Sequence, residues 1–236
     1  MCGSMSKIAE NYQKVLEEIE AARARRTRVP KVAPVQLIAV TKNHDVEAMR
    51  EAIDAGATDV GENRVQEAMK KLPVLDRKVT WHLIGHLQTN KAKHAVEHFS
   101  LIHSVDTPHL ARAIDKEAGK LDKVQDILVQ VNLAKEESKS GVYKEDLRPL
   151  LELTDELSHV RLRGLMLIAP NYDDVEQCRP LFHEMYEIFQ KVKEFPFQTA
   201  NITYLSMGMT HDYRIAVEEG ANMVRVGTAI FGPRQY

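Results

Sequence analysis

The sequence predicts an α/β fold made of a single (β/α)8 TIM-type barrel with an extra N-terminal helix. Eight short apolar segments alternate with helical segments, and eight is the number of parallel strands that closes such a barrel. The length of 236 residues also fits one barrel of this kind. We expect the barrel domain to span residues 6–236 and residues 1–5 to be a disordered or cloning-derived start.

The first expected element is an amphipathic helix over residues 6–26. One face of it is apolar, formed by Ile8, Tyr12, Val15, Leu16 and Ile19. Arginines gather at its end, where cations complement the exposed carbonyl groups; they are Arg23, Arg25, Arg26 and Arg28. A nucleic-acid patch is the alternative, but no aromatic residues that would stack on bases are interleaved. No outer helix is expected after the eighth strand, so this helix is free to cover that flank.

The rest of the chain alternates between strands and helices. The strand candidates are mostly apolar, as strands buried on both faces are, and comprise residues 36–41, 59–62, 80–84, 101–104, 126–131, 162–167, 203–206 and 223–226. The helical segments between them comprise residues 46–55, 64–72, 91–98, 108–119, 144–157, 175–194 and 212–219. An open Rossmann-type sheet is the alternative, but no G-x-G-x-x-G motif follows the first strand.

Composition excludes several classes of protein. The chain has 32 Lys and Arg against 34 Asp and Glu, which argues against a general affinity for nucleic acid or for an anionic membrane. Cys2 and Cys178 cannot form a disulfide framework, so a reducing cytoplasm is expected. No apolar stretch is long enough to span a bilayer.

Lys42 directly follows the first strand, and in a barrel the chemistry lies at the carboxyl ends of the strands. A lysine there is either a surface cation or a functional amine. An amine among apolar walls loses its charge more easily and can condense with an aldehyde. The spacing alone leaves both interpretations open.

The last two strands are each followed by small and hydroxyl-bearing residues that suit a phosphate group. Ser206 ends the seventh strand and Gly208 and Thr210 follow it, while Gly227 and Thr228 follow the eighth. Glycine lets the backbone approach an anion, and these loops frequently bind phosphate in barrels. The alternative is that the hydroxyls only cap and turn the chain.

Other polar residues were weighed in the same way. Arg225 lies within a strand and needs a partner, either an internal carboxylate or the ring nitrogen of a cofactor. The histidine pairs His82/His86 and His94/His98 lack a clear third ligand, so no metal site is expected. The polar stretch 132–141 is either a flexible loop or a lid over a ligand.

These residues together resemble the pyridoxal-phosphate-binding homeostasis proteins, small relatives of the alanine racemase N-terminal barrel. The matching segments are AVTK (39–42), GENRVQE (61–67), WHLIGHLQTNK (81–91), KSG (139–141), RGLM (163–166), LSMGM (205–209), VRVGT (224–228) and IFG (230–232). They run in the family's order over nearly the whole chain. One departure is Arg64, where the family commonly has tyrosine; it either alters the rim of the pocket or contacts solvent.

The resemblance implies a cofactor, pyridoxal 5′-phosphate, and a role for each matching residue. Lys42 would hold the cofactor through a Schiff base, and Arg225 would face its pyridine nitrogen. The phosphate would be held by Ser206, Gly208, Gly227 and Thr228, and Asn63 and His82 would line the pocket.

The resemblance also favours a protein of intracellular cofactor homeostasis, a carrier, buffer or regulator with little or no catalysis and no catalytic residue. An arginine can only donate to the pyridine nitrogen, which weakens the ring as an electron sink, although alanine racemases tolerate this feature and racemisation is therefore not excluded. Racemisation also needs a second acid/base group, which full-length racemases take from a further domain. We expect a monomer that exchanges pyridoxal phosphate with dependent apoenzymes. The alternatives are a compact amino-acid racemase and an aldolase-type barrel enzyme acting on a phosphorylated metabolite.

Overall fold

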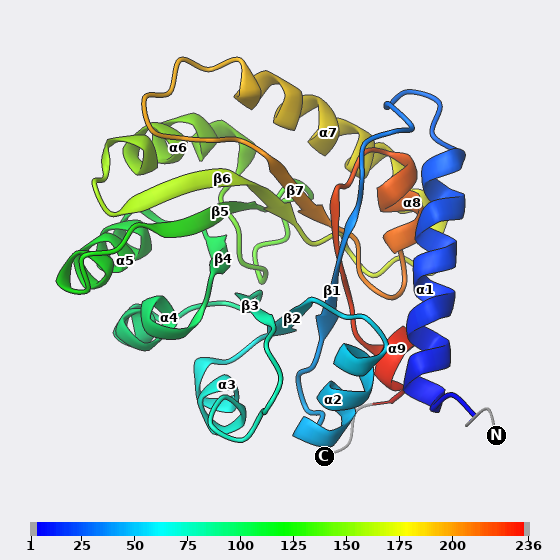
Figure 1. Ribbon diagram of the computed structural model, residues 1–236. Coiled ribbons are helices and arrows are strands. Elements are labelled where there is room, and N and C mark those ends of the chain that lie inside the picture. The colour runs from blue at the N-terminus through cyan, green and yellow to red at the C-terminus, as the bar shows by residue number, and fades with distance from the viewer. Residues whose placement is uncertain (1–3, 234–236) are drawn as a thin grey trace.

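The computed structural model describes residues 4–233 and confirms the predicted barrel (Figure 1). Eight parallel strands close in the order β1 to β8, and β1 pairs with β8 through partners such as Ile38 and Arg225. The strands are β1 (Gln36–Val40), β2 (Asp59–Glu62), β3 (Thr80–Leu83), β4 (Leu101–Val105), β5 (Gln125–Val131), β6 (Val160–Leu167), β7 (Tyr204–Met207) and β8 (Met223–Val226). Of the expected irregular start, residues 1–3, with Cys2, lie outside the described range, and residues 4 and 5 precede the first helix.

Helices cover the outside of the barrel. They are α1 (Lys7–Ala24), α2 (Val46–Asp54), α3 (Val65–Lys71), α4 (Ala92–His98), α5 (Pro108–Lys120), α6 (Leu147–Glu156), α7 (Arg179–Lys193), α8 (Tyr213–Glu218) and α9 (Thr228–Phe231). Short 3-10 turns precede three of them, at Thr89–Lys91, Lys144–Asp146 and Val175–Cys178. The expectation that no helix follows the eighth strand was wrong in detail. The single turn α9 forms there, too short for periodicity to reveal, and ends at Gly232, whose φ is 78°.

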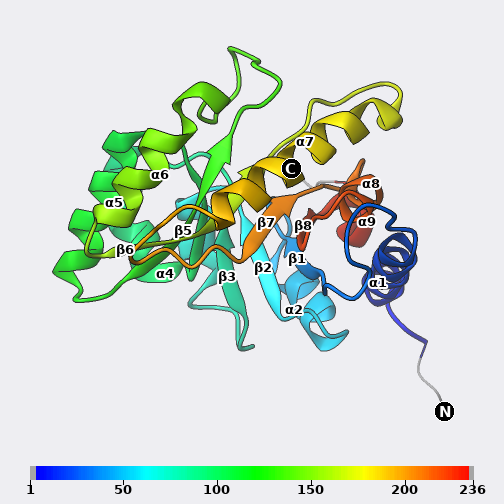
Figure 2. The ribbon, with the colours of Figure 1, turned by 90° about the horizontal axis from the view of Figure 1, so that it is seen from above.

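The helix α1 covers the flank of the barrel between α2 and α8, as expected (Figure 2). Ser6 caps it by accepting a hydrogen bond from the backbone N–H of Ala9 at 3.1 Å. Its buried face carries Tyr12, Val15 and Ile19 of the predicted apolar set. This face packs on α8 and α9, so the N-terminal helix takes the place of a long eighth outer helix.

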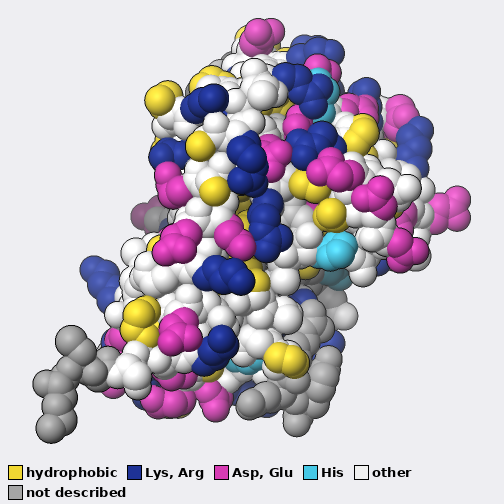
Figure 3. Space-filling model, turned by 90° about the vertical axis from the view of Figure 1, so that its right-hand side faces the viewer, with side chains coloured by type: hydrophobic (Ala, Val, Ile, Leu, Met, Phe, Trp, Pro, Cys, Tyr) yellow, Lys and Arg dark blue, Asp and Glu magenta, His cyan; other side chains and the backbone are white. Residues whose placement is uncertain are grey.

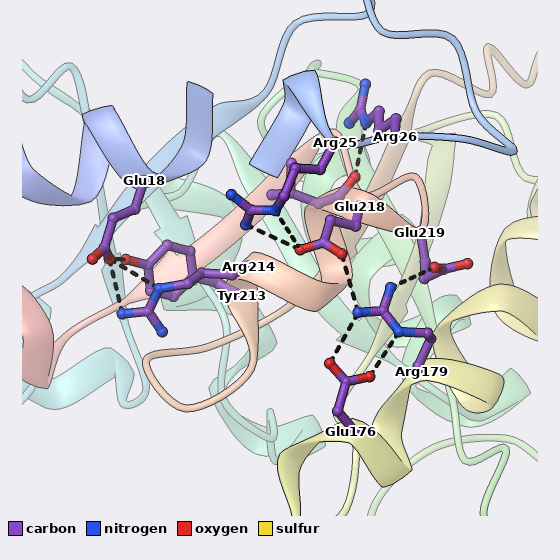
Figure 4. Close-up of polar contacts among 10 residues, drawn as sticks. Glu18, Arg25, Arg26, Glu176, Arg179, Tyr213, Arg214, Glu218 and Glu219 are labelled. Atoms are coloured by element: carbon purple, nitrogen blue, oxygen red, sulfur yellow. Dashed lines mark hydrogen bonds and ion pairs between the residues drawn. The ribbon is translucent and has the colours of Figure 1, made fainter. Parts of the chain in front are cut away.

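The arginine cluster at the end of α1 ties this helix to α8 (Figure 4). Arg26 is 1% exposed, and its guanidinium donates to four backbone carbonyls, those of Val217 (2.7 Å), Ala221 (2.9 Å), Pro30 (3.0 Å) and Ala33 (3.0 Å). Arg25 and Arg28 form ion pairs with Glu218 and Glu219 at 3.0 and 2.5 Å. Arg179 from α7 joins the same two glutamates, at 3.0 and 2.8 Å.

This cluster is therefore structural, which removes the nucleic-acid interpretation of the arginines. Figure 3 views the α1 side of the molecule, where basic and acidic side chains are intermixed. Arg23 is likewise paired, with Glu20 at 2.6 Å. Among residues 4–233, no helix is both long and apolar enough to cross a membrane.

Replacing Arg26 by methionine is expected to destabilise the protein by on the order of 4 kcal/mol. The change leaves buried carbonyl groups without a donor, at about 1–3 kcal/mol each, and water recovers part of that loss. The neighbouring change Arg25→Met is the control, because the Arg25 side chain is 51% exposed and its ion pair is worth at most about 1 kcal/mol. Urea unfolding of both variants measures the difference; equal losses would contradict a specific role for Arg26.

Candidate functional site

A cavity of about 850 Å³ opens at the carboxyl ends of the strands. Of the residues predicted for the site, it brings together Lys42, Asn63, Arg225, Gly227 and Thr228. The loops after β1, β2, β3, β5, β6, β7 and β8 all contribute to its lining. This is the face on which barrels of this type carry their chemistry, and the volume falls within the usual range for small-molecule sites.

Lys42 lies in the cavity wall, half-buried, at the end of β1. The backbone is held on both sides of it. The carbonyl of Thr41 accepts a hydrogen bond from Lys71 Nζ at 2.8 Å, and the N–H of Asn43 donates to Glu67 Oε2 at 2.7 Å. Asn43 has a φ of 62°, a left-handed conformation that asparagine tolerates better than most residues. The stem of the Lys42 side chain therefore starts from a fixed position.

A buried charged cluster lies behind this strand end. Lys71 Nζ contacts Glu62 Oε1 and Glu67 Oε2, both at 2.6 Å, and the Thr41 hydroxyl donates to Glu62 Oε1 at 2.6 Å. Burial raises the pKa of Glu62 to about 7, although Lys71 and Thr41 oppose the shift. Sequence reasoning did not assign Lys71 a role, and its four-residue spacing from Glu67 was the available signal.

Two threonines line the end of the cavity formed by the last two loops. They are Thr228, predicted for the phosphate, and Thr210, whose hydroxyl the sequence analysis also considered. The Thr210 hydroxyl oxygen accepts from the backbone N–H of Ala229 at 3.2 Å, which joins the two loops. Gly227 lies against β1, since a Cβ there would come within 3.2 Å of the Val40 carbonyl oxygen. The glycine thus permits a close backbone approach.

Three predicted residues do not line the cavity, and their contact with the cofactor stays a prediction. Ser206 is fully buried and its hydroxyl faces Arg225 and His103 instead. His82 lies deeper in the barrel, hydrogen-bonded through both ring nitrogens. Gly208 has a φ of 106°, and a Cβ there would lie 2.7 Å from the Cβ of Ala216, so it allows α8 to pack on the end of β7.

Arg225 is 2% exposed yet reaches the cavity wall. It donates to Ser206 Oγ at 2.5 Å and to the Leu167 carbonyl at 3.1 Å, and no ion pair of Arg225 is found within residues 4–233. The internal carboxylate weighed as its partner is thus not in contact; Asp212 acts only from a distance. Burial lowers the pKa of Arg225 to about 10, so the guanidinium stays charged at neutral pH.

The polar loop 132–141 contributes to the lining through Glu136, Ser138, Lys139 and Ser140. Its conformation is set by Asn132, whose side chain donates to the Glu136 carbonyl at 2.7 Å and accepts from the Glu136 N–H at 3.2 Å. Gly141 has a φ of 118° and donates its N–H to Asp106 at 2.9 Å. The loop lies against the cavity, and its motion as a lid stays a prediction.

Three histidines line the cavity: His86, which the sequence places near the end of the third strand, and His44 and His211, which were not predicted for the site. His44 stacks on Phe231 of α9 with a centroid distance of 5.0 Å. The described residues contain no cluster of side chains suited to a metal ion. Arg64 is exposed and does not line the cavity, so it contacts solvent rather than the ligand site.

Comparison with known proteins was made for the whole chain. The model of the alanine racemase N-terminal domain matches residues 7–235. The pyridoxal phosphate homeostasis protein of Aquifex aeolicus is 42% identical over 228 residues, which cover 96% of this chain and 98% of that protein. The protein of the same name from Escherichia coli K12 is 38% identical, covering 98% and 99%.

Solved structures agree with these matches. PipY of Synechococcus elongatus, solved with PLP bound, is 40% identical with a TM-score of 0.83 and covers 95% of this chain and 100% of its own. The alanine racemase of Corynebacterium glutamicum is 13% identical with a TM-score of 0.70; it covers 97% of this chain but only 60% of its own. At that identity the racemase shows a shared fold alone.

Proposed function

Because this chain belongs to the pyridoxal phosphate homeostasis proteins, which share the alanine racemase N-terminal barrel, we propose that it binds pyridoxal 5′-phosphate at Lys42 and serves as an intracellular carrier, buffer or regulator of that cofactor. The observation that carries the proposal is the cavity, which gathers an amine, a buried guanidinium and two hydroxyls around one space. A relative at 40% identity with PLP bound supports the choice of ligand.

The residues of the cavity fit the proposed cofactor. Thr210 and Thr228 offer hydroxyl donors where the last two loops meet, and Gly227 lines the cavity beside Thr228. Arg225 offers a charged donor deeper in the wall. The two threonine hydroxyls suit a dianionic phosphate at one end of the cavity, and the Arg225 guanidinium suits an accepting ring nitrogen at the other.

Lys42 is the proposed covalent contact. When bound, pyridoxal phosphate supplies an aldehyde carbon that an amine can attack. The Lys42 backbone is held by Lys71 and Glu67, so little freedom remains to be lost when its amine engages a ligand. Reversible bonding at one amine requires no second general base, as suits a protein that takes up and releases its ligand.

Arg225 favours a carrier over an enzyme. It cannot give up its proton near neutral pH, so a ring nitrogen opposite it must accept. An unprotonated ring withdraws electrons less well and gives less help to a carbanion. The homeostasis proteins match this chain along nearly their whole length.

The remaining features of the proposal concern the setting of the protein. We propose that it works as a monomer, and the free buried thiol of Cys178 suits a reducing cytoplasm. We expect the loaded protein to hand pyridoxal phosphate to dependent apoenzymes. The test mixes the loaded full-length protein with an apoenzyme and follows the recovered activity. Absence of a visible band after loading would refute binding, and a band without transfer would refute the carrier role.

Changing Thr228 to valine is expected to weaken cofactor binding about 10- to 100-fold without unfolding the protein. It removes one hydroxyl donor to a charged acceptor at nearly constant volume, a loss of about 1.5–3 kcal/mol. Thr80→Val is the matched control, because Thr80 is an exposed strand residue outside the cavity. Equilibrium titration with pyridoxal phosphate gives both affinities. Unchanged affinity in Thr228→Val would place the phosphate elsewhere.

A further inference from the structure

Five side chains from five different strands form a continuous hydrogen-bonded line through the barrel, here called the polar relay. Its members are Asp59 on β2, His82 on β3, His103 on β4, Ser206 on β7 and Arg225 on β8. Each member contacts the next. The distances are 2.8 Å between Asp59 and His82, 2.9 Å between His82 and His103, 3.1 Å between His103 and Ser206, and 2.5 Å between Ser206 and Arg225. Barrel interiors of this type are usually filled by branched apolar side chains, so a polar line through one needs an explanation.

When both histidine rings are neutral, the protons of the polar relay fit one arrangement. Arg225 can only donate, so Ser206 Oγ accepts from it and turns its own hydrogen toward His103 Nδ1. His103 then carries its proton on Nε2 and donates to Nδ1 of His82. His82 in turn carries its proton on Nε2 and donates to the Asp59 carboxylate. Every hydrogen bond thus points from Arg225 toward Asp59.

Two members of the polar relay, His103 and Asp59, are held in the charge states that this direction requires. Burial lowers the pKa of His103 well below its usual value, so this ring is neutral. The pKa of Asp59 lies below its usual value. Burial alone would raise it, but hydrogen bonds from His82 and Thr58 outweigh that effect. The carboxylate also accepts from Gln36 at 2.8 Å and Thr58 at 2.7 Å. Asp59 is therefore an anchored anion.

We propose that His103, His82 and Asp59 are positioning residues for Arg225: through Ser206 they fix the guanidinium in one orientation and direct its remaining N–H groups toward the cavity. Without the polar relay, the guanidinium would keep only the Leu167 carbonyl among its contacts in residues 4–233. This inference rests on the proposed function, since Arg225 is the group expected to face the cofactor ring. It adds that the orientation of Arg225 is set by a line of side chains that begins at Asp59, at the opposite end of the barrel.

The first test examines the polar relay in the full chain without added cofactor, so it does not depend on the proposed function. Nitrogen NMR of protein with labelled histidine distinguishes the two neutral forms of each ring, and His82→Gln and His103→Gln assign the signals. We expect both rings to be neutral with the proton on Nε2. In Asp59→Asn, whose amide can donate, the proton of His82 is expected to populate Nδ1. A charged ring or an Nδ1 proton in the unaltered protein would overturn the proposed direction.

The second test asks whether the polar relay positions Arg225. Ser206→Ala cuts the line next to the guanidinium. Ser104→Ala is the matched control, because Ser104 is equally buried and its hydroxyl has no hydrogen-bond partner within the described residues. The readout is hydrogen exchange of the Arg225 side-chain N–H groups, again without cofactor. We expect exchange at least about tenfold faster in Ser206→Ala and unchanged in Ser104→Ala. Equal rates in all three proteins would overturn the positioning role.

A third measurement links the polar relay to the ligand and separates the two proposals. The ring-nitrogen NMR signal of labelled pyridoxal phosphate is recorded in the same three proteins. A shift in Ser206→Ala, absent in Ser104→Ala, supports the inference. If the ring-nitrogen signal does not move although the Arg225 N–H groups exchange faster, the polar relay does not influence the ligand, and that part of the inference is contradicted. Failure of the unaltered protein to bind the ligand would refute the proposed function, while the first two tests would still decide the polar relay.

Discussion

Changing Lys42 to alanine is expected to abolish the visible absorption band of the cofactor-loaded protein and the adduct that borohydride fixes. The cavity would lose the amine that bonds to the aldehyde, while Thr228 and Arg225 would remain. Weak binding through the phosphate should persist, about 100-fold weaker, which corresponds to about 2.7 kcal/mol. Visible spectroscopy and peptide mapping of the reduced adduct measure these effects.

Two further variants sharpen this result. Lys42→Arg keeps the positive charge but cannot form the bond, so it should behave like Lys42→Ala in the spectrum. Lys139→Ala removes a second amine that lines the same cavity and should retain the band. A fixed adduct mapped to Lys139, or a band that survives in Lys42→Ala, would show that the wrong lysine has been assigned.

The second large effect concerns catalysis: the loaded protein is expected to exchange the α-proton of L-alanine about 10²–10⁴-fold more slowly than a dedicated alanine racemase. That range is what one positioned general acid or base typically contributes. Deuterium incorporation from heavy water, followed together with optical rotation, gives the rate, and Lys42→Ala supplies the background.

A rate within about tenfold of a dedicated racemase would contradict the carrier proposal and favour the compact racemase. The search for its second acid/base group would then begin with the histidines that line the cavity, His44, His86 and His211. Each can be replaced by glutamine and assayed in turn. Loss of exchange in one variant alone would identify that group.

The fold could be predicted because its signals are local. Apolar strand runs alternate with amphipathic helices, and a parallel sheet built from such units leaves few topologies open. Lys42 could be placed for the same reason, since the residue after a buried strand must lie at the carboxyl end of the barrel. The single turn α9 escaped prediction because four residues are too few to show a helical period.

The interior of the site could not be predicted in the same way. Whether Ser206 points into the cavity or toward Arg225 depends on which residues face each other across the barrel, and strand spacing does not encode that. Asp59 and His103 were missed as contacts for the same reason: their partners lie on other strands. Composition could only indicate that such buried polar groups need partners.

The position of α1 has a consequence for how the protein is made. Arg26 donates to the carbonyls of Val217 and Ala221, which lie 191 and 195 residues further along the chain. During synthesis the first helix emerges long before α8 and α9 exist to cover its apolar face. Contacts between residues so far apart in the chain form slowly. Until they form, the uncovered apolar face of α1 favours aggregation. Completion of the barrel is therefore a late event that depends on both ends of the chain, and shielding of the nascent helix would govern the yield of folded protein.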